Sequence, residues 1–509
     1  MISGDILGGR ARLQPDKTAL VYVPNGERFT YRELDSRARK CAQLLTSYSL
    51  KKGDRFGILA QNCVEYLDAF FAAGKSGLIF VPLNYRLTAH ELAYIVRDSG
   101  IKVLFYESQY AEVAAELAKS CDIHATLRLE DEYSEKTKAL DSAAWNDACC
   151  DPEDTWSLLY TSGTTGRPKG VIIPHRMIAF NAYNTAVSWQ LRDDDIAPII
   201  TPLCHAGGLN VFLTPLFLLG GTIVLHRGFD ASEVWRTAQQ ERCTVMMAVP
   251  TIFKMLMEAP EFSTADLSSF RWLISGGAPL PVYIIEAYQR RGITFKQGYG
   301  LTEVGVNCFA MTAEDSQRKL GSIGKPMLCT EAKLIESEGR SIPENEIGEL
   351  CLRGPHVCKG YWNNLEATRA ALDRDGWWHT GDTARRDSEG FYYIAGRTKD
   401  MFISGGVNVY PAEIEAELLM HASVQDAAVV GVNDRKWGEV GVAFVVLRTG
   451  HHASADDLTA FLSQRIAKFK IPREFVFVSA LPRTPYGKVV KRELQEQYRR
   501  EHSDSAANA

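Results

Sequence analysis

Apart from the adjacent Cys149 and Cys150, the cysteines of this 509-residue chain stand singly, and the chain lacks an excess of basic residues; both observations exclude classes of function. None of its 11 cysteines has the Cys-x-x-Cys spacing of a zinc site or a redox motif, so we expect reduced thiols, mostly in the core. Its 57 basic and 62 acidic residues give a net charge of -5, which argues against a nucleic-acid-binding surface as the main function. A local basic groove for a small anion is compatible with this balance.

Long apolar runs are also missing. The longest apolar stretch, residues 209–225, is interrupted by Thr214, Pro215, Gly220, Gly221 and Thr222. It predicts a buried helix followed by a strand, and not a membrane span. The first five residues have no basic flank before an apolar run, and the last four, Ala-Ala-Asn-Ala, form no peroxisomal address. We therefore expect no signal peptide and a cytoplasmic location.

Strand and helix patterns alternate through the first three-quarters of the chain. Thr30 and Glu33 have the spacing of a capping box and predict a helix to about residue 45. Helices are also expected at 64–73 and 89–97, and short apolar strands at 55–60, 78–81, 103–106, 197–200, 222–226, 244–248 and 272–275. This order predicts an α/β fold in which helices cover both faces of mostly parallel sheets.

The length exceeds what one hydrophobic core normally serves, so two domains are expected. Composition changes near Gly396, after which strand-like runs at 427–432, 441–447 and 474–478 flank a helix-like stretch at 456–469. This predicts a small α+β unit. We place a large N-terminal domain at 1–396, a joint at 397–400 and a C-terminal domain at 401–509, whose polar tail after Gln495 is expected to fray.

Residues 160–170 read Tyr-Thr-Ser-Gly-Thr-Thr-Gly-Arg-Pro-Lys-Gly and directly follow an apolar stretch. Hydroxyls and amides offer donors to an oligophosphate, glycine lets the backbone approach closely, and the lysine supplies a point charge. Pro168 before the lysine and Gly170 after it exclude the spacing of a P-loop. An ordinary polar turn is the alternative, but a run of this length favours phosphate binding by Thr161, Ser162, Gly163, Thr164, Thr165, Gly166 and Lys169.

Four later segments contain residue types suited to nucleotides and metals. Residues 298–303 read Gly-Tyr-Gly-Leu-Thr-Glu, where a flat ring suits a base and a hydroxyl and a carboxylate suit phosphate and Mg2+. Residues 377–382 end in an aspartate, which when ionised presents only acceptors to a diol. Residues 396–415 contain an arginine and a glycine pair, and residues 482–488 end in a lysine. Taken singly, these are a tight turn, a β-turn aspartate, a solvated charge run and a solvated lysine.

Together the five segments resemble the motifs of the adenylate-forming superfamily, which contains acyl-CoA synthetases, peptide-synthetase adenylation domains and beetle luciferases. The phosphate loop is followed by matches to Gly-Tyr-Gly-x-Thr-Glu, Trp-x-x-Thr-Gly-Asp, a glycine loop and Pro-x-Thr-x-x-Gly-Lys. All five stand in family order and cover essentially the whole chain. The chain is thus identified as a member of the acyl-CoA synthetase branch, with a mobile C-terminal domain.

The resemblance implies a role for each matched residue at the nucleotide. Glu303 is expected to ligate Mg2+ with Thr302 beside it, Asp382 to accept hydrogen bonds from the ribose, and Arg397 to hold ribose or phosphate. Lys488 is expected as the catalytic lysine between the substrate carboxylate and the α-phosphate, where a long cation offsets the negative charge that gathers. Further nucleotide-binding candidates are Gly277, Ala278 and Tyr299.

Other matched residues serve the acyl group, CoA and domain movement. His205 matches a position beside the acyl pocket and is kept among the catalytic candidates, as a packing gate more than a base. Lys399 matches the hinge residue of the family. Gly405 and Gly406 match a loop that lines the pantetheine tunnel, where a side chain would block a thin ligand. Trp437 falls near a CoA position, although a surface location explains it equally well.

The implied reaction is an acid–CoA ligation that uses ATP, Mg2+ and coenzyme A. The carboxylate of a small-molecule acid attacks the α-phosphorus, giving acyl-AMP and pyrophosphate, and the CoA thiol then attacks the acyl carbon after the C-terminal domain rotates. We favour a medium- or long-chain fatty acid, with an aryl acid next, because small residues at 276–278 and Gly300 leave room for either. Transient contact with a membrane surface and a homodimer are left open.

Four alternatives remain at this point. An adenylation enzyme that passes the acyl group to a carrier protein normally has an aspartate just after the His205 position when its substrate is an amino acid, and Ala206-Gly207-Gly208 has none. A luciferase-like oxidase shares the first half-reaction. A phosphotransferase or ATPase would release ADP, and a non-catalytic nucleotide-binding module is disfavoured because both Glu303 and Lys488 are present.

Overall fold

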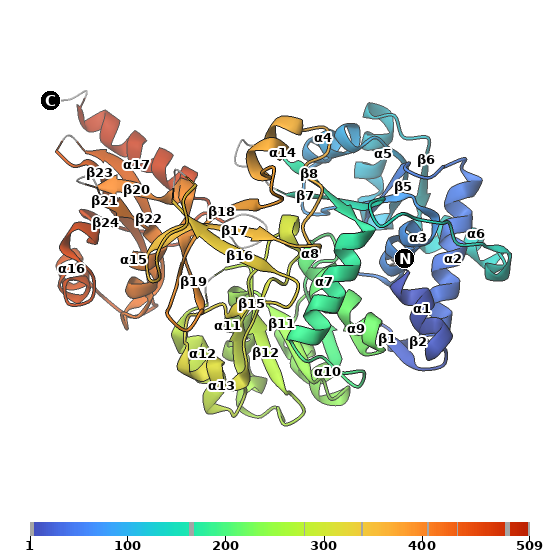
Figure 1. Ribbon diagram of the computed structural model, residues 1–509, viewed down its shortest axis with the longest axis horizontal. Helices are drawn as coiled ribbons and strands as arrows, with labels where there is room; N and C mark the ends of the chain where they lie inside the picture. The colour runs from blue at the N-terminus through green and yellow to red at the C-terminus, as the bar shows by residue number, and fades with distance from the viewer. Residues whose placement is uncertain are drawn as a thin grey trace.

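The computed structural model describes residues 5–161, 167–278, 280–336, 339–404, 407–434, 436–483 and 489–506. The chain forms a large body, from residue 5 to about residue 397, and a smaller C-terminal unit at one end of the molecule (Figure 1). The predicted large N-terminal and small C-terminal parts are therefore confirmed. Eight predicted site residues lie outside the described residues: Ser162, Gly163, Thr164, Thr165, Gly166, Gly405, Gly406 and Lys488.

The first sheet has six strands in the order β6-β5-β3-β4-β7-β8, and all neighbours except β7 and β8 are parallel. Its strands are short and mostly apolar, as buried parallel strands require. Their bounds are β3 (Arg55–Leu59), β4 (Ile79–Leu83), β5 (Ile101–Tyr106), β6 (Ala125–Arg128), β7 (Thr155–Thr161) and β8 (Lys169–Pro174).

Two more sheets complete the first part of the chain. One has the order β2-β1-β10-β9, with β1 (Thr18–Tyr22), β2 (Glu27–Thr30), β9 (Ile196–Ile199) and β10 (Thr222–Leu225); only β1 and β2 are antiparallel. The other is wholly parallel and contains β11 (Val245–Ala248), β12 (Trp272–Ser275) and β13 (Phe295–Gln297). These sheets confirm the strands predicted at 197–200, 222–226, 244–248 and 272–275.

Capping residues mark the ends of several helices. Thr30 and Glu33 form the predicted capping box at the start of α2 (Tyr31–Ser47). Helix α3 (Val64–Ser76) ends at Gly77, whose φ of 70° is a conformation that glycine adopts without strain. The remaining long helices of this part are α1 (Ile6–Leu13), α4 (Ala89–Ser99), α5 (Ala111–Ser120), α7 (His175–Ser188), α10 (Ala231–Gln240), α11 (Pro250–Glu258) and α12 (Val282–Arg290).

The apolar stretch at 209–225 is folded as predicted. It forms a π-helical turn (Leu209–Leu213), then α9 (Thr214–Leu219), then β10. Gly220, with φ of 95°, ends the helix and turns the chain into the strand. In the part of the chain that the structure describes, no helix has the length and apolar character needed to cross a membrane.

A fourth sheet is wholly antiparallel and was not predicted. It contains β16 (Glu331–Ile335), β17 (Ile347–Arg353), β18 (Trp378–Arg386) and β19 (Tyr392–Arg397) in that order. Figure 1 shows these strands between the large body and the C-terminal unit. Arg397 ends β19, a 3-10 turn (Thr398–Asp400) follows, and the next strand belongs to the C-terminal unit.

The C-terminal unit is a five-stranded sheet with helices on two sides. Its elements are β20 (Phe402–Ser404), β21 (Val407–Val409), α15 (Pro411–Leu419), β22 (Val424–Asp434), β23 (Gly438–Leu447), α16 (Ala455–Ser463), β24 (Glu474–Phe477) and α17 (Lys491–Ala506). Alternate residues of β22 enter two cores, because Ala427 and Val429 pack with α15 and α16 while Ala428 and Val430 pack with Leu494 of α17.

Two predictions for this unit are wrong in detail. Helix α16 ends at Ser463 and not near residue 469, because the amides of Arg465 and Ile466 both donate to the carbonyl of Leu462 and close the helix. The tail after Gln495 does not fray but continues α17 to Ala506. Two hydrogen bonds hold it on the sheet: the Tyr498 hydroxyl donates to Glu474 at 2.7 Å, and the Gln495 amide to the Gly431 carbonyl at 3.1 Å.

Candidate active site

The phosphate loop connects β7 and β8 as a hairpin. Thr161 and Lys169 are directly paired across the two antiparallel strands, so the ends of the loop are held together by the sheet. The ammonium group of Lys169 lies 5.0 Å from the centre of the Tyr361 ring, a cation–π contact. The structure therefore places one end of the predicted phosphate loop against an aromatic residue that the sequence motifs do not contain.

Tyr361 also connects this loop to Glu303. Its hydroxyl donates to Oε1 of Glu303 at 3.0 Å. Burial, and next the charge of Glu303, raise the pKa of Tyr361, so the hydroxyl stays protonated as a donor. The segment around it is anchored on both sides: the Trp362 amide donates to the Gly170 carbonyl at 2.7 Å, and the Cys358 amide to the Glu303 carbonyl at 2.8 Å.

Glu303 lies in a short 3-10 turn (Thr302–Val304) directly after a tight bend. The bend requires glycine, because a Cβ at Gly300 would lie 2.3 Å from the carbonyl oxygen of Val306. The hydroxyl of Thr302 and the carboxylate of Glu303 are hard oxygen donors on half-buried residues, and Mg2+ prefers such ligands. With Lys169 across Tyr361, this donor set suits Mg2+ together with an oligophosphate.

The predicted ribose residues are in contact. Asp382 and Arg397 are paired across β18 and β19, and Nε of Arg397 lies 3.2 Å from Oδ1 of Asp382. The other carboxylate oxygen of Asp382 accepts a hydrogen bond of 2.7 Å from the Tyr299 hydroxyl. Burial, and next the charge of Asp382, raise the pKa of Tyr299. The 6% exposed Asp382 is thus fixed between a phenol and a guanidinium, with acceptor capacity left for a diol.

The turn before Asp382 is supported by a second carboxylate. Gly381 has φ of 69°, and its amide donates to Oε1 of Glu349 at 3.1 Å. The other oxygen of Glu349 lies 3.0 Å from Nδ1 of His379. The Thr380 hydroxyl donates to the Leu350 carbonyl at 2.6 Å. Neither Glu349 nor Tyr361 was predicted from the sequence, because the residues to which they are hydrogen-bonded, Gly381 and Glu303, are distant in sequence.

Small residues gather where β11, β12 and β13 end. The three strands are in parallel register, so Val249, Gly276 and Gly298 follow them at the same edge of the sheet. A Cβ at Gly276 would lie 3.7 Å from the Gly298 carbonyl oxygen, and a Cβ at Gly277 would lie 3.6 Å from Cγ1 of Val249. Gly277 and the next residue, Ala278, are exposed.

The His205 segment borders the same edge. His205 is half-buried and precedes a short helical turn (Ala206–Gly208). A Cβ at Gly207 would lie 3.7 Å from Cε of Met247, a half-buried residue of β11. Met247, Val249 and the glycines at 207, 276, 277 and 298 therefore lie close together at this edge of the sheet, in a group that we call the glycine cluster. Tyr299 follows Gly298, so the cluster adjoins the ribose residues.

The structure gives positions for Lys399 and Trp437, the candidates of the hinge and the C-terminal unit. Among the described residues, no contact joins either of them to the nucleotide residues. Lys399 is exposed in the 3-10 turn that links the two parts. Trp437 is 45% exposed and lies beside Gly438, which pairs with Ser404 of β20. Gly405 and Gly406, outside the described residues, connect β20 to β21, so Trp437 and this hairpin are neighbours on one edge of the C-terminal sheet.

Comparison with known families and proteins agrees with this geometry. The AMP-binding enzyme family matches residues 9–362, and the AMP-binding enzyme C-terminal domain matches residues 413–488. A feruloyl-CoA synthase from Amycolatopsis sp is 39% identical over 489 residues, which cover 96% of this chain and 97% of that protein. The long-chain-fatty-acid–CoA ligase FadD13 of Mycobacterium tuberculosis is 36% identical over 499 residues, covering 97% and 98%.

The same likeness holds among solved structures. The O-succinylbenzoate coenzyme A synthetase of Bacillus subtilis, in complex with ATP and a magnesium ion, superposes with a TM-score of 0.87 at 34% identity. The match covers 96% of this chain and 99% of that one. Family, relatives and solved structure all extend over both parts of the chain. The chain therefore belongs to the AMP-binding enzyme family, in its acyl-CoA synthetase branch.

Proposed function

We propose that this ATP-dependent acyl-CoA synthetase activates an apolar monocarboxylic acid, and that an aromatic acid is preferred to a fatty acid. The observation that carries the proposal is the glycine cluster. Gly207, Gly276 and Gly277 contribute no side chains, and the two side chains beside them, Met247 and Val249, are apolar and uncharged. An acyl group placed against this cluster would meet backbone and apolar atoms, which suit an apolar planar ring.

This order of preference reverses the one drawn from the sequence, where a fatty acid came first. The feruloyl-CoA synthase that is 39% identical to this chain supports the aromatic acid. The fatty acid stays as the second candidate because the ligase FadD13, 36% identical, acts on long-chain fatty acids by its name. Transfer to a carrier protein is not favoured, since the relatives with similarity along the whole chain are CoA ligases.

In the first half-reaction the residues of the large body hold ATP while the carboxylate attacks the α-phosphorus. Lys169 and the hydroxyls of 161–165 hold the phosphates, and Asp382 and Arg397 hold the ribose. Glu303 would hold Mg2+, which would supply positive charge to offset that of the phosphates. Lys488 extends a cation toward the α-phosphate oxygens, where negative charge gathers. The products of this step are acyl-AMP and pyrophosphate.

In the second half-reaction the C-terminal domain, residues 401–509, rotates about the joint at 397–400, with Lys399 as the pivot. Rotation removes Lys488 and brings the hairpin with Gly405 and Gly406 to the adenylate. Trp437, beside that hairpin, then contacts CoA. The CoA thiol loses its proton, sulfur forms the thioester bond, and the bond from the acyl carbon to AMP breaks.

The test is a panel of acids incubated with Mg-ATP, with and without CoA, in which AMP and thioester are measured. Arylalkenoic acids are expected to give a higher kcat/KM than medium- and long-chain fatty acids. Formation of ADP, or no thioester from any acid, would refute the reaction class. A higher kcat/KM for fatty acids would refute the substrate preference while leaving the reaction class intact.

A variant of the glycine cluster tests the same proposal by changing the protein. Gly207→Leu places a side chain against Met247, and a penalty of about 1–3 kcal/mol from overpacking would correspond to roughly a 5- to 150-fold higher KM for the aromatic acid. The matched control is Gly228→Leu, because Gly228 is exposed and a Cβ there meets no atom within 4 Å. Equal KM values for the two variants would contradict the position of the acyl group.

A further inference from the structure

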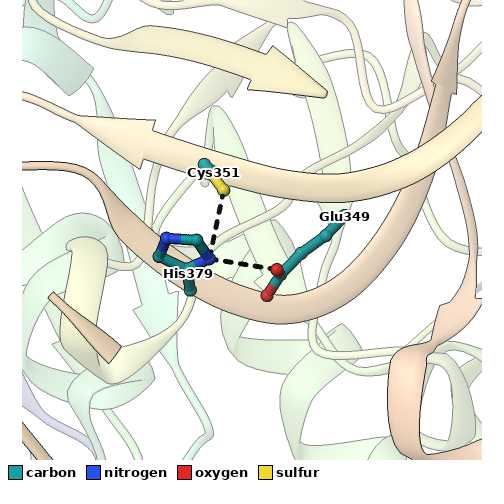
Figure 2. Close-up of side chains that lie close together, drawn as sticks. All are labelled: Glu349, Cys351 and His379. Atoms are coloured by element: carbon teal, nitrogen blue, oxygen red, sulfur yellow. Dashed lines mark hydrogen bonds and ion pairs between the residues drawn. The ribbon is translucent and has the colours of Figure 1, made fainter. Parts of the chain in front are cut away.

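One face of the antiparallel sheet carries three metal-ligating side chains beside the ribose residues. Glu349 and Cys351 are two residues apart on β17, so their side chains point to the same face. Cys351 is paired directly with His379 across β17 and β18. Figure 2 shows the three side chains converging, with the imidazole of His379 between the thiol and the carboxylate.

Their spacing suits a single ion. Nδ1 of His379 lies 3.7 Å from Sγ of Cys351 and 3.0 Å from Oε2 of Glu349. Metal–sulfur and metal–nitrogen bonds of about 2.3 and 2.0 Å at a tetrahedral angle separate sulfur and nitrogen by about 3.5 Å, and the corresponding nitrogen–oxygen separation is about 3.4 Å. The two distances from Nδ1 are thus within about 0.4 Å of the separations that zinc requires, and the three ligand atoms all lie within 4.8 Å of one another.

We propose that Glu349, Cys351 and His379 bind one thiophilic divalent cation of the class of Zn2+ or Cd2+. Thiolate and imidazole select such ions over Mg2+, which prefers oxygen ligands. Cys351 is buried, whereas the side chains of Glu349 and His379 are 25% and 29% exposed, so the ion enters from the solvent side and leaves a position for water. Binding forms a metal–sulfur bond and releases the thiol proton to water.

A fourth residue places a negative charge near the imidazole. Oδ2 of Asp373 lies 3.9 Å from Nε2 of His379, the ring nitrogen that does not face Cys351 and Glu349. A carboxylate there favours the tautomer with the proton on Nε2, which leaves the lone pair of Nδ1 to the metal. Without an ion, a proton on Nδ1 donates the hydrogen bond to Oε2 of Glu349, and the ion replaces this proton.

The site is coupled to nucleotide binding through Glu349. The same carboxylate accepts the amide of Gly381, one residue before Asp382. A cation bound at Oε2 draws negative charge away from Oε1, so the hydrogen bond from the Gly381 amide to Oε1 weakens and the turn that presents Asp382 is held less firmly. The ion and the nucleotide therefore weaken each other's binding, and by linkage the factor is the same in both directions.

The direct test uses Co2+ added to the tag-free full chain, because a thiolate ligand gives a near-ultraviolet charge-transfer band. Wild-type protein is expected to bind one equivalent with this band. Cys351→Ser is expected to lose the band, and His379→Asn and Glu349→Gln to weaken Co2+ binding at least about 10-fold. In the control, Cys149 and Cys150, which are neighbours in sequence and are exposed and half-buried respectively, are both replaced by serine. The band is expected to persist in this control.

Two results would overturn the proposal. The absence of the band in wild-type protein refutes the site, whether or not the variants fold. A band that persists in Cys351→Ser, or is lost in the Cys149 and Cys150 variant, places the metal elsewhere. The coupling is tested by AMP titration without Mg2+, in the presence and absence of Zn2+: a several-fold weaker affinity for AMP is expected, and an unchanged affinity refutes the coupling.

Discussion

Removal of one hydroxyl group tests the contact that connects the phosphate loop, through Tyr361, to Glu303, the proposed magnesium ligand. Tyr361→Phe keeps the ring that faces Lys169 at 5.0 Å and removes only the hydrogen bond of 3.0 Å to Glu303. A hydrogen bond to a charged group contributes about 1.5–3 kcal/mol, and about 1.4 kcal/mol corresponds to a tenfold change. If the bond positions Glu303 for Mg-ATP, adenylation is expected to slow by roughly 10- to 150-fold.

The assay is acid-dependent exchange of pyrophosphate into ATP, measured over a range of Mg2+ concentrations. Tyr361→Phe is expected to need more Mg2+, because the carboxylate that binds the ion is no longer fixed. Tyr498→Phe is the matched control, since its hydroxyl donates to Glu474 at 2.7 Å in the C-terminal unit. If Tyr361→Phe exchanges pyrophosphate as well as the control does at every Mg2+ concentration, the positioning role is wrong.

Three further predictions concern other parts of the molecule. Lys488→Ala is expected to abolish adenylation but to keep thioester formation from supplied acyl-AMP; loss of both half-reactions would contradict its role. Burial lowers the pKa of Lys296 from 10.5 to about 8. Below pH 8 the buried lysine is charged and lowers the free energy of unfolding, and this destabilisation decreases as the pH rises from 8 to 10.5. Lys296→Met is thus expected to raise the free energy of unfolding by up to about 3 kcal/mol at pH 7 and by little at pH 10.5 in denaturant titrations; a gain independent of pH would exclude this cause. The guanidinium of Arg448, in the C-terminal unit, lies 5.2 Å from the centre of the Tyr283 ring in the large body. Arg448→Ala removes this contact and is expected to slow adenylation about 2- to 5-fold. Faster pyrophosphate exchange in the variant would show that the contact does not stabilise the adenylating arrangement.

Local signals in the sequence predicted much of the fold. The capping box of Thr30 and Glu33 and the strands that follow its helix depend on neighbours within a few residues, and the structure confirms them. The strands β1 and β2, which precede the capping box, were not predicted. The antiparallel sheet was missed because β18 contains Thr380, Gly381 and Asp382 and alternates poorly between apolar and polar residues. The helix α17 was missed because its anchors, Glu474 and Gly431, lie in other strands.

The residues of the candidate site also fall into two groups, those predicted from motifs and those found only in the structure. Motifs gave Tyr299, Asp382 and Arg397, and the structure places these three in contact. Tyr361 could not be found from a motif, because its bond to Glu303 joins residues 58 positions apart. Glu349 supports Gly381 from 32 positions away, and only the pairing of β17 with β18 brings them together.

The end of β19 has a consequence for the order of events in catalysis. Arg397 contacts Asp382 and is followed at once by the 3-10 turn that joins the C-terminal unit. The strand end that contains the proposed ribose residues is therefore directly continuous with the joint. If the C-terminal unit rotates as proposed, the rotation would act directly on the Arg397–Asp382 pair, and a nucleotide bound there would resist it. We expect AMP to be released fastest while the C-terminal unit rotates. AMP release would then occur during the rotation that returns the enzyme to the arrangement for the next adenylation.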